Sequence, residues 1–87
     1  MPNIVMYGSP RCPYCQRACQ LLDGKGVAYT FLNVDEQPRL WAELRARSQR
    51  DTVPQIFIDE RHVGGSDELA ALEVRGELNR LLELDAT

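Results

Sequence analysis

Three cysteines lie within eight consecutive positions of this 87-residue chain: Cys12, Cys15 and Cys19. A cluster of this kind can be a structural disulfide, part of a metal site or a reactive thiol pair. A Cys12–Cys15 disulfide would enclose only two residues, and closing so small a loop removes little entropy from the unfolded chain. A structural disulfide is therefore the weakest of the three interpretations.

The residues around Cys12 favour its thiolate. Pro13 is well suited to the first position of a helix, so we expect Cys12 at a helix N-terminus. Unpaired backbone N–H groups and the positive end of the helix dipole stabilise an anion there, and Arg11 adds a nearby cation. Because the thiolate is the species that attacks disulfides, Cys12 is predicted to be a nucleophile.

Cys15 follows three residues later, on the same face of the predicted helix. It begins an apolar stripe at helical spacing, formed by Cys15, Ala18, Cys19 and Leu22. We therefore expect Cys15 to be more buried and less ionised than Cys12. This asymmetry fits a mechanism in which Cys12 forms a mixed disulfide and Cys15 resolves it by attacking Cys12. Cys19 is interpreted as a buried, inert thiol.

Zinc binding is the main rival chemistry. Cys12, Cys15, Cys19 and His62 would suffice for a tetrahedral site. Structural zinc ligands usually come as two separated pairs, however, and His62 is a single residue on a predicted hairpin. Thiol–disulfide chemistry is favoured, and no metal ligands are predicted.

The rest of the chain predicts an α/β domain in the order β-α-β-α-β-β-α. Strands are expected at residues 3–7, 27–34, 55–58 and 62–63. Helices are expected to begin at Pro13 and Pro38 and after Ser66 as an N-cap, with a closing helical segment at residues 78–82 and a polar loop at residues 48–52. The first two strands, joined by a helix, should be parallel, the hairpin should extend the sheet antiparallel, and helices should cover both faces.

Length and charge exclude several classes of protein. Eighty-seven residues make one domain, spanning residues 1–87. The net charge of −3, without a basic stripe, argues against nucleic acid as a partner. No apolar run approaches the roughly 20 residues that cross a bilayer, and the N-terminus lacks the pattern of a secretory signal. We therefore expect a cytoplasmic protein without a membrane partner.

Three motifs in this order resemble the glutaredoxin family: CPYC at residues 12–15, TVP at residues 52–54 and GGSD at residues 64–67. The similarity spans nearly the whole chain, from residue 3 to residue 82. It implies a thioredoxin-like fold, with a four-stranded mixed sheet flanked by helices. It also implies a glutathione-dependent oxidoreductase that reduces protein disulfides and glutathione mixed disulfides, with glutathione as electron donor and no bound cofactor. The oligomeric state is open, and a monomer is the default expectation.

The resemblance further implies how glutathione is bound. Val53 would pair its backbone with the cysteine of glutathione beside Cys12, and the Val53–Pro54 peptide would be cis. The γ-glutamyl carboxylate would meet the N–H groups of Ser66 and Asp67, with Asp67 close to the ammonium; the same two residues would equally suit a simple helix start. The implied binding residues are Arg11, Tyr14, Thr52, Val53, Pro54, Gly65, Ser66 and Asp67.

Two positions depart from the family pattern. Ser9 stands where relatives often carry a lysine, and Asp51 stands where they often carry a basic residue. Those cations help to hold the glycine carboxylate of glutathione. The candidate substitutes are Arg11, Arg50, Gln37 and Arg47.

Two other functions stay open at this point. One is a redoxin that takes electrons from thioredoxin reductase and serves ribonucleotide reductase, although its usual WSGFRP-like ending is absent from residues 65–87. The other is an iron–sulfur carrier in which two chains share a cluster through Cys12 and two glutathiones, which Pro13 argues against. For Cys19, a regulatory disulfide or glutathionylation is the alternative to an inert thiol.

Overall fold

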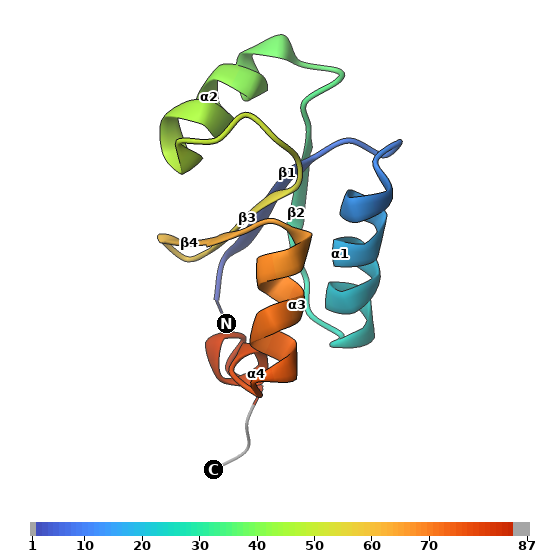
Figure 1. Ribbon diagram of the computed structural model, residues 1–87, viewed down its shortest axis with the longest axis vertical. Coiled ribbons are helices and arrows are strands. Elements are labelled where there is room, and N and C mark those ends of the chain that lie inside the picture. Colours follow the sequence, from blue (N-terminus) through green and yellow to red (C-terminus); the bar gives the residue numbers. More distant parts are fainter. Residues whose placement is uncertain (1, 85–87) are drawn as a thin grey trace.

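The computed structural model describes residues 2–84, and this range contains four strands and four helices (Figure 1). In chain order they are β1 (Ile4–Gly8), α1 (Pro13–Gly24), β2 (Thr30–Asn33), α2 (Pro38–Ser48), β3 (Gln55–Ile58), β4 (Arg61–Gly64), α3 (Ser66–Val74) and α4 (Leu78–Leu81). None of the helices in this range is long and apolar enough to cross a membrane.

The four strands form one mixed sheet in the order β2-β1-β3-β4. The β1–β2 pair is parallel, with α1 as the crossover, whereas β1–β3 and β3–β4 are antiparallel. This confirms the predicted topology. β2 is shorter than the predicted residues 27–34, because its register begins with Val5 opposite Thr30. Val27 and Tyr29 instead pack against the core ahead of the strand.

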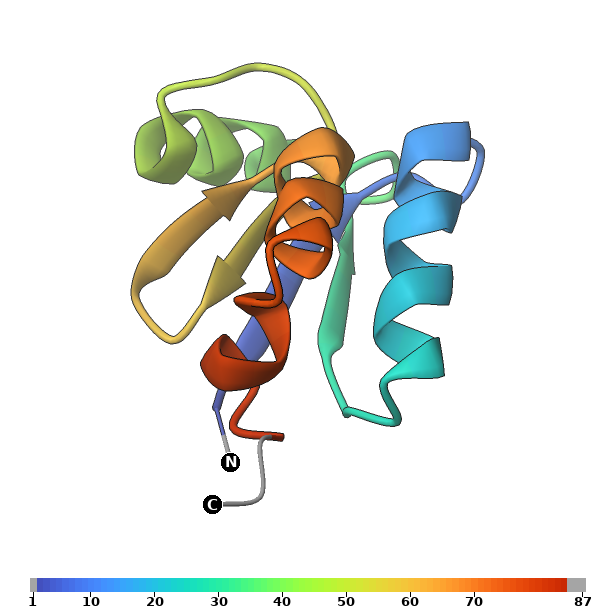
Figure 2. The same ribbon diagram turned by 60° about the horizontal axis from the view of Figure 1, so that its bottom comes forward.

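Each face of the sheet carries its own apolar cluster, so helices cover both faces (Figure 2). Successive residues of a strand point to opposite faces, which places Met6 in one cluster and Tyr7 in the other. The larger cluster, which includes residues of α1, α3 and α4, consists of Ile4, Met6, Ala18, Leu22, Val27, Ile56, Ile58, Leu69, Leu72, Leu78 and Leu82. The smaller cluster, with α2, consists of Tyr7, Val34, Leu40, Leu44 and Phe57.

Two predicted helix boundaries are wrong. Gly65, not Ser66, is the N-cap of α3, because the backbone is still extended at Gly65 and turns helical at Ser66. The Gly65 N–H donates to the Glu68 carboxylate at 2.8 Å. Ser48, predicted to open a polar loop, ends α2 instead, and its buried hydroxyl donates to the Leu44 carbonyl at 2.6 Å.

The end of β1 packs closely against β2 and α1, which leaves little room for a side chain at Gly8. A Cβ on Gly8 would lie 3.0 Å from the Phe31 ring and 3.1 Å from Cys15 Sγ. We expect Gly8→Ala to lower the free energy of unfolding by about 1–3 kcal/mol, because the extra methyl overpacks the core. Urea unfolding of the purified variant measures this loss.

Gly24→Ala is the matched control. Nothing lies within 4 Å of a Cβ at Gly24, the last residue of α1. We expect its free energy of unfolding to stay the same or rise by up to about 1 kcal/mol, because alanine favours a helix over glycine. Equal losses in the two variants would contradict the packing argument.

Candidate active site

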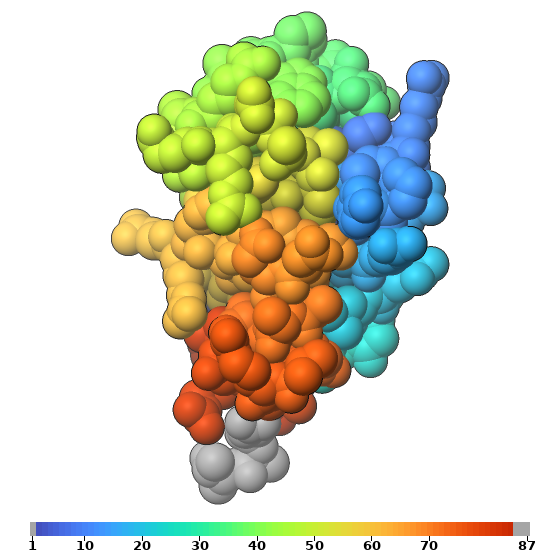
Figure 3. All heavy atoms as spheres, in the orientation of Figure 1, coloured from blue at the N-terminus to red at the C-terminus, as the bar shows by residue number. Residues whose placement is uncertain are grey.

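Three segments far apart in the sequence meet on one face of the molecule. They are the start of α1, the loop ahead of β3 and the start of α3, drawn in blue, yellow and orange in Figure 3. They enclose a groove of about 190 Å³. Its lining residues are Tyr14, Arg50, Thr52, Val53, Pro54, Gln55, Gly65, Ser66, Asp67 and Glu68.

Cys12 is the N-cap of α1, as predicted, with Pro13 as the first helical residue. Its backbone is extended, and its N–H donates to the Ser9 carbonyl at 3.1 Å, which closes a turn ahead of the helix. The half-buried Sγ lies 3.8 Å from the Val53 carbonyl oxygen, at the edge of the groove. The sulfur thus lies at a helix N-terminus and next to Val53, which lines the groove.

Cys15 lies on the core side of the same helix and is only 1% exposed. Burial, the largest cause, raises the pKa of its thiol to about 12; the neighbouring Cys12 adds to this, while the Ser9 N–H, 3.4 Å from Sγ, acts in the opposite direction. Cys15 is therefore a protonated thiol at neutral pH. The predicted burial of Cys15 is confirmed, and all three cysteines are free thiols.

Cys19 and His62 lie on opposite faces of the sheet. Cys19, predicted to be buried, is only half-buried, because it packs against the edge of the larger cluster with Sγ 3.8 Å from Met6 Sδ. The His62 ring stacks on Phe57, which belongs to the smaller cluster, with 4.9 Å between the ring centroids. Within residues 2–84, no three His, Cys, Asp or Glu side chains are grouped so that they could hold a metal ion.

All predicted binding residues except Arg11 line the groove. Arg11 is exposed, and its N–H donates to Ser9 Oγ at 3.3 Å. The Ser9 hydroxyl is tied to the Asp35 carboxylate, so the position that is often lysine in relatives anchors the turn before α1. The Val53–Pro54 peptide is cis, as the resemblance implied.

Of the other residues suggested to replace the missing cations, one lines the groove and two do not. Arg50 lines the groove. Arg47 does not: its guanidinium stacks 4.0 Å from the centre of the Phe57 ring and donates to the Tyr7 hydroxyl at 2.9 Å. Gln37 also lies outside the lining and accepts hydrogen bonds from Arg39. The groove cation is thus Arg50.

Glu68 is a groove residue that was not among the predicted binding residues. One of its carboxylate oxygens accepts both the Gly65 N–H at 2.8 Å and Arg50 Nη1 at 2.6 Å. The Gly65 N–H, followed by Arg50, holds the pKa of Glu68 below its ordinary value. Its spacing of three residues from the N-cap is the sequence signal that could have indicated this contact.

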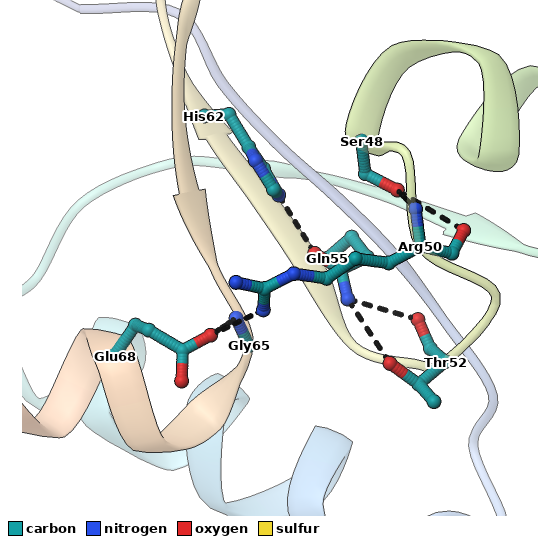
Figure 4. A network of polar contacts seen from close by, with 7 residues as sticks. All are labelled: Ser48, Arg50, Thr52, Gln55, His62, Gly65 and Glu68. Carbon is teal, nitrogen blue, oxygen red and sulfur yellow. Dashed lines mark hydrogen bonds and ion pairs between the residues drawn. The ribbon is translucent and has the colours of Figure 1, made fainter.

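Gln55 is the second residue that the sequence analysis missed. It is 1% exposed, and its amide nitrogen donates to the carbonyl of Thr52 at 3.1 Å and to its hydroxyl at 3.2 Å (Figure 4). Its amide oxygen lies 2.7 Å from His62 Nε2. Because a carbonyl only accepts, the amide nitrogen must face Thr52, and His62 must donate through Nε2. A polar residue in the buried QIFI run was the available signal.

His62 is neutral in this network at neutral pH. Burial, followed by the charge of Arg50, lowers its pKa below the ordinary 6.5; Arg47 acts in the same direction and Glu68 opposes them. The unfolded chain therefore binds more protons than the folded chain in the range just below pH 6.5. The contribution of neutral His62 to the free energy of unfolding is therefore fully present above about pH 6.5. It is lost as the pH falls towards the folded-state pKa of His62.

Removing the imidazole should remove this acid sensitivity. We expect His62→Phe to be about 1–3 kcal/mol less stable at pH 7.5, since Gln55 loses its donor, and to lose less further stability than wild type on acidification. Urea unfolding at pH 7.5 and pH 5.5 measures both effects. If wild type and His62→Phe lose the same free energy of unfolding between pH 7.5 and pH 5.5, His62 does not titrate in this range.

The thiols should differ in reactivity. We expect iodoacetamide at pH 7.5 to modify Cys12 and to leave Cys15 unmodified, because Cys15 is buried and its pKa is about 12. Peptide mass spectrometry measures the labelling of each cysteine, and labelling in urea, where all three should react, is the control. Labelling of Cys15 as fast as Cys12 would contradict the described arrangement.

Comparison with known proteins gives a consistent set of relatives. The sequence model of the family described as Glutaredoxin matches residues 4–63. The chain is 48% identical over 83 residues to Glutaredoxin 3 of Escherichia coli strain K12, covering 95% of this chain and 100% of that protein. It is 51% identical over 82 residues to Glutaredoxin of Pseudomonas aeruginosa strain PAO1, covering 94% and 98%.

Solved structures agree with the sequence relatives. The solution structure of glutaredoxin from Brucella melitensis matches with a TM-score of 0.84 and 45% identity, covering 100% of this chain and 95% of that one. The crystal structure of a buckwheat glutaredoxin–glutathione complex matches with a TM-score of 0.87 and 28% identity, covering 94% and 77%.

Proposed function

Because the chain belongs to the glutaredoxin family of thiol–disulfide oxidoreductases and has its thioredoxin-like fold, we propose that it uses glutathione to reduce protein disulfides and glutathione mixed disulfides. One observation carries the proposal. The accessible Cys12 sulfur lies at the N-terminus of α1 beside Val53, while Cys15 behind it is buried and protonated. Reduction of a protein disulfide requires a nucleophilic thiolate and a second thiol that resolves the mixed disulfide.

Reduction of a glutathione mixed disulfide needs Cys12 alone. The Cys12 thiolate attacks the glutathione sulfur, the disulfide bond of the substrate breaks, and the substrate protein leaves as a thiolate that takes up a proton. A free glutathione thiolate then attacks the glutathione sulfur bound to Cys12. Glutathione disulfide forms, and the Cys12 thiolate returns, stabilised by the helix start.

Reduction of a protein disulfide uses both cysteines. Cys12 attacks one substrate sulfur and forms a mixed disulfide, and the other substrate sulfur leaves as a thiolate. Cys15 then attacks Cys12 Sγ, its proton passes to one substrate thiolate, the other substrate thiolate takes up a proton from water, and the substrate is released as a dithiol. Two glutathione molecules reduce the resulting Cys12–Cys15 disulfide and become glutathione disulfide.

The groove supplies contacts for a glutathione moiety. Among residues 2–84, the Val53 N–H makes no backbone hydrogen bond, which leaves it free to pair with the cysteine of glutathione. The backbone N–H groups of Ser66 and Asp67 open α3 and suit the γ-glutamyl carboxylate. Arg50 suits the glycine carboxylate, and Tyr14, 53% exposed, forms a wall.

The proposal extends to domain organisation, oligomeric state, cofactors and location. Residues 1–87 form a single domain that acts as a monomer, and its substrates are disulfide-containing or glutathionylated proteins. Glutathione is a co-substrate, and no bound cofactor takes part. Such chemistry needs cysteines kept as free thiols, which fits the reducing conditions of the cytoplasm.

A coupled assay tests the proposal. NADPH consumption is followed with either a glutathionylated peptide or a protein disulfide as substrate. We expect turnover with glutathione and glutathione reductase, because the groove suits glutathione. Cys12→Ser should abolish turnover of both substrates, whereas Cys15→Ser should abolish only turnover of the protein disulfide, since only that substrate needs a resolving thiol.

Thioredoxin reductase in place of glutathione and its reductase is the control arm. Turnover in that arm alone would contradict the proposed function and would favour the redoxin alternative. Loss of mixed-disulfide turnover in Cys15→Ser would contradict the separate roles of the two sulfurs.

A further inference from the structure

The groove holds its one cation in an ion pair. Among residues 2–84, the lining contains a single positively charged side chain, Arg50, and two carboxylates, Asp67 and Glu68. Arg50 Nη1 lies 2.6 Å from Glu68 Oε1. Figure 4 shows the Arg50 side chain extending past Gln55 towards Gly65 and Glu68. A ligand carboxylate that approaches Arg50 therefore also approaches the negative charge of Glu68.

We propose that Glu68 limits the affinity of the groove for a glutathione moiety, because its carboxylate competes with a ligand carboxylate for Arg50. The inference rests on the proposed use of glutathione and deepens it. A guanidinium binds a carboxylate best through two parallel hydrogen bonds. With Nη1 bound to Glu68, an incoming carboxylate must displace Glu68 or share Arg50 with a like charge.

The ion pair is open enough for this exchange. The side chains of Arg50 and Glu68 are 48% and 42% exposed, so water screens their attraction and the pair adds little to the stability of the fold. Both groups can therefore exchange partners without unfolding the start of α3. The backbone N–H groups of Ser66 and Asp67 suit the γ-glutamyl carboxylate, which leaves Arg50 for the glycine carboxylate.

The charge of Glu68 can be separated from its second contact. Glu68 Oε1 accepts the Gly65 N–H at 2.8 Å, which supports the first turn of α3. An amide oxygen accepts this hydrogen bond as well, so Glu68→Gln keeps the cap and removes the charge. The variant thus tests competition for Arg50 without removing the helix cap.

The expected result is a gain of function. We expect Glu68→Gln to raise kcat/KM for a glutathionylated peptide about three- to tenfold at low salt, since one like charge leaves the ligand site. The gain should shrink at 0.5 M NaCl, where exposed charges are screened. The assay is the coupled measurement with glutathione reductase, and circular dichroism verifies that each variant is folded.

Glu73→Gln is the matched control. Glu73 is on the same helix and forms an ion pair with Lys25 at 2.7 Å, outside the groove lining. The substitution changes the net charge by the same amount, and we expect kcat/KM to stay at the wild-type value. An equal gain in Glu73→Gln would overturn the inference, because it would assign the effect to net charge alone.

Arg50→Gln tests whether Glu68 acts through Arg50. We expect the gain from Glu68→Gln to vanish in the Arg50→Gln background, since there is no cation left to release. The full gain in that background would overturn the inference. A loss of kcat/KM in Glu68→Gln would also overturn it and would assign Glu68 to the ammonium of the ligand. Wild-type protein without glutathione-dependent turnover would overturn the proposed function itself, and the inference with it.

Discussion

The turn between β1 and α1 is the constraint on which the site depends. Ser9 positions both cysteines: its carbonyl accepts the Cys12 N–H, and its own N–H donates to Cys15 Sγ. Gly8, just before it, leaves the space that the Cys15 sulfur occupies. A single turn thus holds one sulfur at an open helix end and packs the other into the core. The chemical difference between two neighbouring cysteines follows from this backbone path.

The groove beside Cys12 is built on a second set of contacts. The buried Gln55 amide ties Thr52 to the sheet, and Thr52 is followed directly by Val53, whose carbonyl lies close to the Cys12 sulfur. The groove floor beside the Cys12 sulfur is therefore held to the sheet by hydrogen bonds. The charged rim of the groove consists of Arg50 and Glu68, whose side chains are half-exposed, so their ion pair is screened by water. A floor held by hydrogen bonds and a rim that can exchange partners suit the proposed cycle, in which glutathione binds and its disulfide is released.

Local sequence patterns predicted the helices and strands, but they could not predict contacts between residues far apart in the sequence. Proline at positions 13 and 38 marked two helix starts because its preference is local. The start of β2 depends on where β1 begins to pair, and the helical placement of Ser48 depends on its buried bond to Leu44. The Arg50–Glu68 contact joins residues 18 positions apart, so no local spacing indicates it.

Hydrogen bonds join Thr52, Gln55 and His62 in a series, so the residue types at these three positions depend on one another. The central amide donates on one side and accepts on the other, so each neighbour needs a partner of matching polarity. An apolar residue at position 55 would remove the partner of His62 Nε2 and of the Thr52 carbonyl and hydroxyl, and a carboxylate would face the Thr52 carbonyl. We therefore expect residues 52, 55 and 62 to change together among related proteins, because a change in one removes a hydrogen-bond partner of another.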